Sequence, residues 1–179
     1  CKKDDYNFLK CDRINIKGKL KSIAELCIDK GLDDTDIQIL APMYKGISGI
    51  DSLNKSISDK FNIDYSFTIE SKDKVFKQGD KVIQLVNRNE DNIMNGDIGE
   101  VDSFIYNENQ ITGMNVKFDS GIVSYDKESY EQLKLAYAIS IHKSQGSEFY
   151  TTIIPFTKRY NIMLKKRLYY TAITRAKSY

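Results

Sequence analysis

Residues 135–149 read LAYAISIHKSQGSEF, and residues 168–177 read LYYTAITRAK. The first stretch opens with a short apolar run typical of a buried strand and continues into a polar loop, His142–Glu148. The second has apolar residues at helical spacing and carries one arginine, Arg175, among small residues. Ligand sites in open α/β sheets gather at the carboxyl ends of strands. The closing third of the chain therefore predicts an α/β layer with a polar site at one edge.

The same alternation of helix and strand occurs at both ends of the chain. Apolar periodicity predicts helices over residues 16–30, 50–61 and 164–177, the first of them stopping at Gly31. Short apolar runs predict strands over residues 36–40, 133–139 and 151–155. Helix, strand, loop and helix in this order indicate one α/β unit built from the two ends.

The middle of the chain has no helical period. Short strand-like runs occupy residues 65–69, 81–86, 98–106, 111–118 and 122–125, with Gly and Asn turns between them. Asp80 and Asp97 stand beside glycines and are interpreted as turn-forming carboxylates. Closely spaced strands of this kind predict a small antiparallel barrel or sandwich. The predicted organisation is a discontinuous α/β domain (1–64 and 132–179) that carries an inserted β module (65–131).

The composition limits the function classes. The 27 Lys and Arg residues nearly cancel the 25 Asp and Glu residues, so any nucleic-acid binding must come from local placement of basic groups. Three cysteines without CxxC spacing and a single histidine argue against a zinc site and a disulfide framework, and no metal site is predicted. No apolar run reaches the roughly 18–20 residues that span a bilayer. A cytoplasmic protein without membrane contact is expected.

Taken alone, the two polar sites leave alternatives open. The loop at 142–148 offers hydroxyl, amide and imidazole groups that can hold a sugar-phosphate backbone, yet it also fits a plain surface loop. Arg175 can stabilise charge on a phosphate bound by a neighbouring domain, or it can form a surface salt bridge.

A family resemblance favours the functional interpretations. The two stretches resemble motifs V and VI of the RecD-like helicases, the family of the exodeoxyribonuclease V alpha subunit. Residues 39–54 (ILAPMYKGISGIDSLN) resemble the motif IV region, and residues 76–101 resemble the SH3-like barrel inserted in the second motor domain. The four segments follow the family order. The resemblance implies a RecA-like second motor domain of P-loop NTPase type, with a parallel sheet and an inserted SH3-like barrel.

The resemblance also implies roles for individual residues. Arg175 corresponds to the arginine finger that faces the γ-phosphate. Lys45 lies near a position where the family often has a phosphate-contacting arginine, although lysine lacks the bidentate fork. Residues implied to couple the strand to the nucleotide are Gln145, Gly146 and Glu148. Residues implied to contact single-stranded DNA are Ser140, His142, Lys143 and Ser144, with Gln84, Asn87 and Asn95 in the barrel. For the barrel residues, simple turn and surface roles remain open.

The chain lacks two elements that nucleotide hydrolysis needs. It has no GxxxxGK[ST] loop and no strand ending in an acidic pair for magnesium; Gly18-Lys19 lies inside a predicted helix. ATP and Mg²⁺ are therefore expected to be held mainly by an N-terminal motor domain of the same polypeptide. The isolated chain, which opens on Cys1 and is expected to be a piece of a longer protein, is predicted not to turn over ATP.

The implied parent is an ATP-dependent DNA helicase of recombination and repair, with 5′ to 3′ travel taken from the family. Its implied partners are single-stranded DNA, the N-terminal motor domain and, for exodeoxyribonuclease-type relatives, subunits of a nuclease–helicase complex. Two alternatives remain. One is a catalytically silent single-strand-binding module, and the other is the helicase half of a conjugative relaxase.

Overall fold

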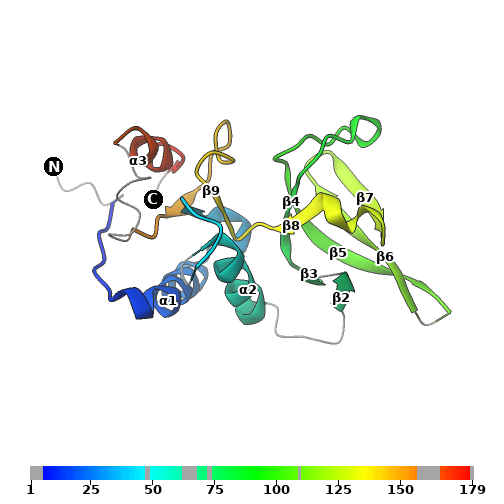
Figure 1. Cartoon of the computed structure of the whole chain (residues 1–179), viewed down its shortest axis with the longest axis horizontal. Helices are drawn as coiled ribbons and strands as arrows, with labels where there is room; N and C mark the ends of the chain where they lie inside the picture. Colours follow the sequence, from blue (N-terminus) through cyan, green and yellow to red (C-terminus); the bar gives the residue numbers. More distant parts are fainter. Residues whose placement is uncertain are drawn as a thin grey trace. The chain divides into compact units, whose positions relative to one another are not determined.

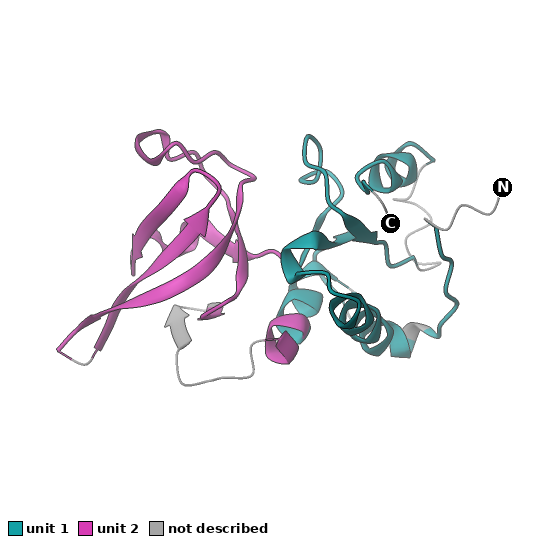
Figure 2. Cartoon of the chain, turned by 180° about the vertical axis from the view of Figure 1, so that it is seen from behind, with its two compact units in different colours: residues 1–56, 137–179 teal, residues 57–136 magenta. Residues whose placement is uncertain are grey.

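The structure is a computed structural model that describes residues 6–46, 49–61, 68–71, 74–108, 110–156 and 166–177. The chain divides into two compact units, coloured separately in Figure 2. Unit 1 comprises residues 1–56 and 137–179, and unit 2 comprises residues 57–136.

Unit 1 is built on a three-stranded parallel sheet. Its strands are β1 (Ile37–Ala41), β9 (Ala138–Ser140) and β10 (Thr151–Ile153), in the order β10-β1-β9. All five residues of β1 are buried, as expected for the central strand of a covered parallel sheet. In the register of the sheet, Ala41 pairs with Ser140, so β1 and β9 end at the same edge.

Helices cover this sheet on both faces. Figure 1 shows α1 (Ile16–Asp29) and α2 (Ile50–Phe61) on one side and α3 (Lys166–Ile173) on the other. Two short 3₁₀ turns, η1 (Arg13–Asn15) and η2 (Asp34–Asp36), precede α1 and β1. The sheet with helices on both faces is the predicted α/β layer.

The apolar stripes that predicted the first two helices are their buried faces. In α1 the buried residues are Ile16, Leu20 and Ala24, and the chain leaves the helix through Gly31 at φ +89°. In α2 the residues Ile50, Leu53 and Ile57 are 4%, 1% and 2% exposed. The predicted helices over 16–30 and 50–61 are thereby confirmed.

Unit 2 is a small antiparallel β structure. A five-stranded sheet has the order β7-β6-β5-β4-β8, and β2 and β3 form a separate antiparallel pair. The strands are β2 (Thr68–Ser71), β3 (Lys74–Lys77), β4 (Lys81–Gln84), β5 (Ile98–Asn107), β6 (Gln110–Phe118), β7 (Gly121–Asp126) and β8 (Leu133–Leu135). Short 3₁₀ turns occur at η3 (Asn89–Asp91) and η4 (Ser129–Gln132).

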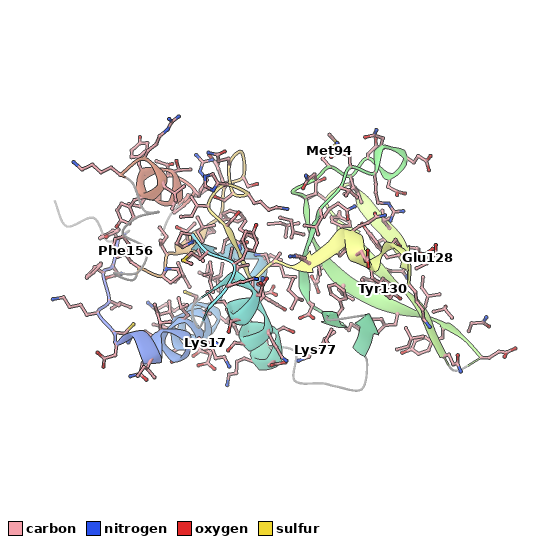
Figure 3. The ribbon with its side chains drawn as sticks, in the orientation of Figure 1. Lys17, Lys77, Met94, Glu128, Tyr130 and Phe156 are labelled. Carbon is pink, nitrogen blue, oxygen red and sulfur yellow. The ribbon has the colours of Figure 1, made fainter. Side chains whose placement is uncertain are left out.

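The core of unit 2 is apolar and aromatic. Val82, Met114, Val116 and Leu133 are fully buried, and Tyr130, labelled in Figure 3, packs into the same cluster. Two predicted turn carboxylates are confirmed, because each accepts a backbone N–H three residues away. Asp80 accepts from the amide of Lys77 at 2.8 Å, and Asp97 accepts from the amide of Met94 at 2.8 Å.

Two predicted elements differ from the structure. The prediction of a single strand over 133–139 is wrong, because this segment forms two strands. Strand β8 pairs with β4 in unit 2, and β9 pairs with β1 in unit 1. Strand β9 is fully buried, whereas β8 has Leu133 buried and Lys134 exposed, and no turn residue in the sequence marks the passage between the two sheets. The helix predicted to reach residue 177 ends at Ile173. The segment after it pairs instead with the backbone of Phe149, which draws it out of helical geometry. Residues 65–67 of the first predicted barrel strand and residues 164–165 lie outside the described residues.

Candidate nucleic-acid and nucleotide interface

The loops after β1 and β9 leave the sheet at one edge. Tyr44 follows β1, and its hydroxyl donates a long hydrogen bond, 3.5 Å, to Oγ of Ser140 at the end of β9. Lys45 is exposed in the same loop. The chain then enters α2, whose first amides bond back to this loop: Ile50 N–H to the carbonyl of Met43 at 2.9 Å. The predicted motif IV and motif V loops therefore lie side by side.

Strand β9 is anchored from α2 by a buried asparagine. Asn54 is 5% exposed; its Oδ1 accepts the N–H of Ala138 at 2.6 Å, and its Nδ2 donates to the carbonyl of Ala138 at 2.9 Å. On the other side of the strand, Ile39 N–H donates to the carbonyl of Tyr137 at 3.0 Å. Alternate residues of a parallel strand face opposite neighbours. Asn54 thus occupies the position of a further strand.

The loop after β9, residues 141–146, is a compact turn that its own hydroxyl groups hold. Ser144 is fully buried, and its Oγ donates to the carbonyl of Ile141 at 2.8 Å. Oγ of Ser140 accepts the N–H of Lys143 at 3.2 Å. Gly146 closes the turn at φ +90°. Of the residues predicted to touch DNA here, both serines are therefore buried and bonded within the loop.

The remaining loop side chains face outward. His142, Gln145, Gly146 and Glu148 are exposed, and Lys143 is half-buried. The loop thus presents one ammonium and one imidazole group to solvent within two consecutive residues. Such groups can contact a phosphate backbone without reading bases.

Arg175 lies against the far end of this loop. Its carbonyl accepts the N–H of Phe149 at 2.8 Å, and the N–H of Lys177 donates to the carbonyl of Phe149 at 2.7 Å. Its Nη1 donates to the carbonyl of Ser147 at 3.2 Å. Its Nε is buried and has no hydrogen-bond partner among the residues that the structure describes. Its Nη2 is 3.5 Å from Oγ1 of Thr174. A half-buried guanidinium has five N–H donors, and those not used in these two bonds can donate to an anion.

An exposed ion pair lies beside this connection. Lys177 Nζ is 3.8 Å from Oε2 of Glu148, and both side chains are more than half exposed. A pair this exposed contributes little to stability. The carboxylate of Glu148 therefore remains accessible for other contacts.

The three barrel residues of the predicted site differ in exposure. Gln84 is fully buried: its Oε1 accepts the hydroxyl of Tyr125 at 2.8 Å, and its Nε2 is 3.4 Å from Gln132 Oε1. Asn87 and Asn95 are exposed on the loop between β4 and β5, where Oδ1 of Asn87 accepts the N–H of Asn95 at 2.8 Å.

The same loop contains two exposed apolar side chains and an arginine that sequence reasoning missed. Val86 is 44% exposed and Met94, labelled in Figure 3, is 52% exposed. Arg88 pairs with Asp91 at 2.7 Å and lies 4.6 Å from the centroid of the Tyr125 ring. Burial raises the pKa of Tyr125 to about 12, and the charge of Arg88 partly opposes this rise.

The described residues contain no group of three or more His, Cys, Asp or Glu side chains arranged to bind a metal ion. Within the same part of the chain, every helix is too short or too polar to cross a membrane.

The fold and the site together define a class. A RecA-like parallel sheet with a polar loop after an edge strand, an arginine segment paired to that loop and an inserted β-barrel is the architecture of a helicase second motor domain. The chain superposes on the Pif1 helicase from Bacteroides in complex with ADP-AlF3 and single-stranded DNA with a TM-score of 0.56. This match covers 94% of the chain and 43% of that protein at 20% identity, and it supports the fold alone.

The sequence comparisons give the family. Residues 53–118 match the SH3 domain of ATP-dependent RecD-like DNA helicases, and residues 135–179 match the UvrD-like helicase C-terminal domain. The chain is 32% identical to the ATP-dependent RecD2 DNA helicase of Deinococcus radiodurans over 141 residues, 79% of this chain and 19% of that protein. It is 31% identical to the RecBCD enzyme subunit RecD of Buchnera aphidicola subsp. Acyrthosiphon pisum over 145 residues, 78% of this chain and 23% of that subunit.

The chain belongs to the RecD-like superfamily 1 helicases and corresponds to their C-terminal motor region. It spans about a fifth of the length of these curated relatives. The predicted family and the predicted fold, a RecA-like second motor domain with an SH3-like barrel, are confirmed.

Proposed function

We propose that this chain is the second motor domain, with its inserted barrel, of an ATP-dependent DNA helicase that moves 5′ to 3′ on single-stranded DNA in recombination and repair. The proposed domains keep the predicted order: 1–64 and 132–179 for the motor domain, and 65–131 for the barrel. Strand β8 (Leu133–Leu135) is the exception, because it pairs with β4 and belongs to the barrel. The observation that carries the proposal is the contact between Arg175 and the loop after β9. It joins a phosphate-seeking group directly to a DNA-facing loop.

Arg175 acts in this proposal as the arginine finger. ATP is the substrate and supplies the γ-phosphate, whose charge in phosphoryl transfer a guanidinium stabilises. The guanidinium fits this role because it has further N–H donors beyond its bonds to Ser147 and Thr174, and these can donate to a phosphate oxygen. Lys45, exposed in the loop after β1, supplies a second positive charge in this proposal.

The loop after β9 holds the DNA strand. His142 and Lys143 supply the backbone contacts, while Ser140 and Ser144, also in the proposed binding set, keep the loop in shape through their internal hydrogen bonds. Gln145, Gly146 and Glu148 connect His142 and Lys143 to the segment that bonds to Arg175, and they transmit movement from one to the other. Contacts of this kind to phosphates weaken as salt rises.

The barrel guides the same strand through the loop between β4 and β5. Asn87 and Asn95 supply its exposed amides, whereas Gln84 supports the loop from the barrel core.

ATP and Mg²⁺ are held mainly by an N-terminal motor domain of the same polypeptide. This assignment is supported by the missing phosphate loop in the sequence. The isolated chain then binds single-stranded DNA weakly and does not turn over ATP. We propose a cytoplasmic location, because the parent acts on DNA. If the parent belongs to a nuclease–helicase complex, the other subunits of that complex are further partners.

The test uses the full-length parent protein. Its ATP turnover is measured with and without single-stranded DNA, and unwinding is measured on duplexes with a 5′ or a 3′ tail. Stimulation by DNA and unwinding of the 5′-tailed duplex alone are expected. Unwinding from the 3′ tail contradicts the polarity. A parent without DNA-stimulated turnover contradicts the motor itself and favours a silent single-strand-binding module.

A further inference from the structure

We propose that Asn54 is a positioning residue for the DNA contact, an inference that rests on the function proposed above. The loop 141–146 follows β9 directly, and β9 is an edge strand of only three residues in the sheet of unit 1. A short edge strand has few backbone hydrogen bonds to hold its position. The two bonds from Asn54 hold the N–H and the carbonyl of Ala138 on the side of the strand that faces away from β1.

Burial makes these bonds necessary. Ala138 is fully buried, so its N–H and carbonyl cannot turn to water when Asn54 is removed. Leaving two buried backbone groups without partners is costly, and a shift of the strand is the way to relieve that cost. Any shift at Ala138 passes to Ser140, the end of the strand, and then into the loop.

The loop moves as one body when the strand moves. Oγ of Ser140 accepts from Lys143, and Oγ of Ser144 donates to Ile141, so the turn is braced from within. His142, exposed between these bonds, has no independent freedom to restore its position. Displacement of β9 therefore displaces the DNA-facing side chains.

The same helix also fixes the loop after β1. The amides of Ile50 and Asp51 at the start of α2 donate to the carbonyls of Met43 and Tyr44 at 2.9 and 3.3 Å. Lys45 comes next in that loop. Through Asn54, α2 therefore holds the loop of Lys45 and the loop of His142 in one frame, so that both shift together.

The experiment measures ATP turnover of the full-length parent against the concentration of single-stranded oligothymidylate. Asn54→Ala removes both bonds. Asn54→Asp is nearly isosteric and keeps the acceptor for the N–H of Ala138, but it brings a carboxylate oxygen against the carbonyl of Ala138. This variant replaces Asn54→Ala in the experiment if the alanine variant does not fold. Leu53→Ala, at a fully buried neighbour on α2, destabilises the helix without touching these bonds.

Both Asn54 variants are expected to raise the half-saturating DNA concentration about ten-fold through the lost buried hydrogen bonds. Turnover without DNA and turnover at saturating DNA are expected to stay unchanged. Hydrogen–deuterium exchange in the parent is expected to quicken over residues 136–149. Leu53→Ala is expected to lower the melting temperature while keeping the wild-type DNA dependence.

Two results would overturn the inference: wild-type DNA dependence in a folded Asn54 variant, or an equal shift in Leu53→Ala. Either result leaves the proposed function standing if the wild-type protein is stimulated by DNA. A wild-type parent that DNA does not stimulate overturns the proposed function and this inference with it.

Discussion

The guanidinium of Arg175 donates to the carbonyl oxygen of Ser147 at 3.2 Å, across 28 residues of sequence. The backbones of Arg175 and Phe149 are bonded beside it at 2.8 Å. If Arg175 turns toward a nucleotide phosphate, it must release Ser147, whose N–H bonds to the carbonyl of Ser144 within the loop. One hydrogen bond thus links the proposed arginine finger to the loop after β9, which is proposed to bind DNA.

Replacing Arg175 by alanine in the parent protein is expected to lower ATP turnover by about three orders of magnitude, the usual contribution of an arginine finger. Nucleotide affinity is expected to change little. Steady-state turnover and binding of a fluorescent nucleotide measure the two effects. Arg167→Ala, at an exposed arginine of α3, is the matched control and keeps its turnover. Turnover within a few-fold of wild type in Arg175→Ala would remove the finger assignment.

His142 and Ser144 are expected to respond differently to alanine. His142 is exposed, so His142→Ala weakens single-strand binding at low salt and leaves the melting temperature unchanged. Ser144→Ala removes a buried hydrogen bond to Ile141 and costs about 1 kcal/mol of unfolding free energy. Fluorescence anisotropy with labelled DNA and denaturant unfolding check the pair. Equal DNA affinity of His142→Ala and wild type contradicts the proposed contact.

Gln84 and Asn87 provide the same contrast in the barrel. Gln84→Leu leaves the buried hydroxyl of Tyr125 without its 2.8 Å acceptor and is expected to cost about 1–3 kcal/mol of stability. Asn87→Ala, on the exposed loop, is expected to lower DNA affinity with a small loss of stability. Thermal unfolding and DNA titration separate the effects. If Gln84→Leu weakens DNA binding at full stability, Gln84 contacts the strand itself.

Two glycines are expected to tolerate alanine unequally. A Cβ at Gly49 would meet the backbone carbonyl groups of Tyr44 and Lys45, so Gly49→Ala is expected to cost about 1–3 kcal/mol through overpacking. Gly18, within α1, has open space around its Cβ position, and Gly18→Ala is expected to stabilise by about 0.5–1 kcal/mol. Urea unfolding of both variants measures the difference. A stable Gly49→Ala would mean that the loop after β1 can open.

Asp126 gives a pH-dependent prediction. Hydrogen bonds from the hydroxyl and amide of Ser129 lower the pKa of Asp126 below its ordinary value. A lowered folded-state pKa adds stability above the unfolded pKa, about 3.9, and this stability is lost as the pH falls through the folded pKa. NMR titration of the carboxyl group is expected to show the lowered pKa in wild type and a higher one in Ser129→Ala. An unchanged pKa in Ser129→Ala would show that other groups hold the carboxylate.

Periodicity predicted α1 and α2 because each has a buried face, and a short apolar run predicted β1, whose five residues are all buried. Four barrel strands, β4 to β7, were also located from the turns that flank them, and Asp80 and Asp97 mark two of these turns. Strand β3 (Lys74–Lys77) was not predicted. The passage from β8 to β9 escaped prediction because no turn residue separates the two strands, and composition does not tell which sheet a strand joins.

Side-chain roles within the site were less visible in the sequence. The family resemblance implied a DNA contact for Ser144, and the sequence did not show that its hydroxyl donates to the carbonyl of Ile141 within the loop. The sequence contained a weak indication that Asn54 is buried, because Asn54 stands four residues after Ile50 on the apolar stripe of α2. A polar residue in that position implies a buried partner, but the identity of Ala138 required the three-dimensional structure.

The bonds between Asn54 and Ala138 also lie where the inserted barrel leaves and rejoins the motor domain. Asn54 lies three residues before unit 2 begins, and Ala138 lies one residue after the chain has returned to unit 1. Hydrogen bonds between these two residues thus connect the points where the chain leaves unit 1 and returns to it. The two segments of the motor domain are therefore joined directly where the insert leaves and returns, and β9 is attached to α2 by bonds that the barrel does not supply.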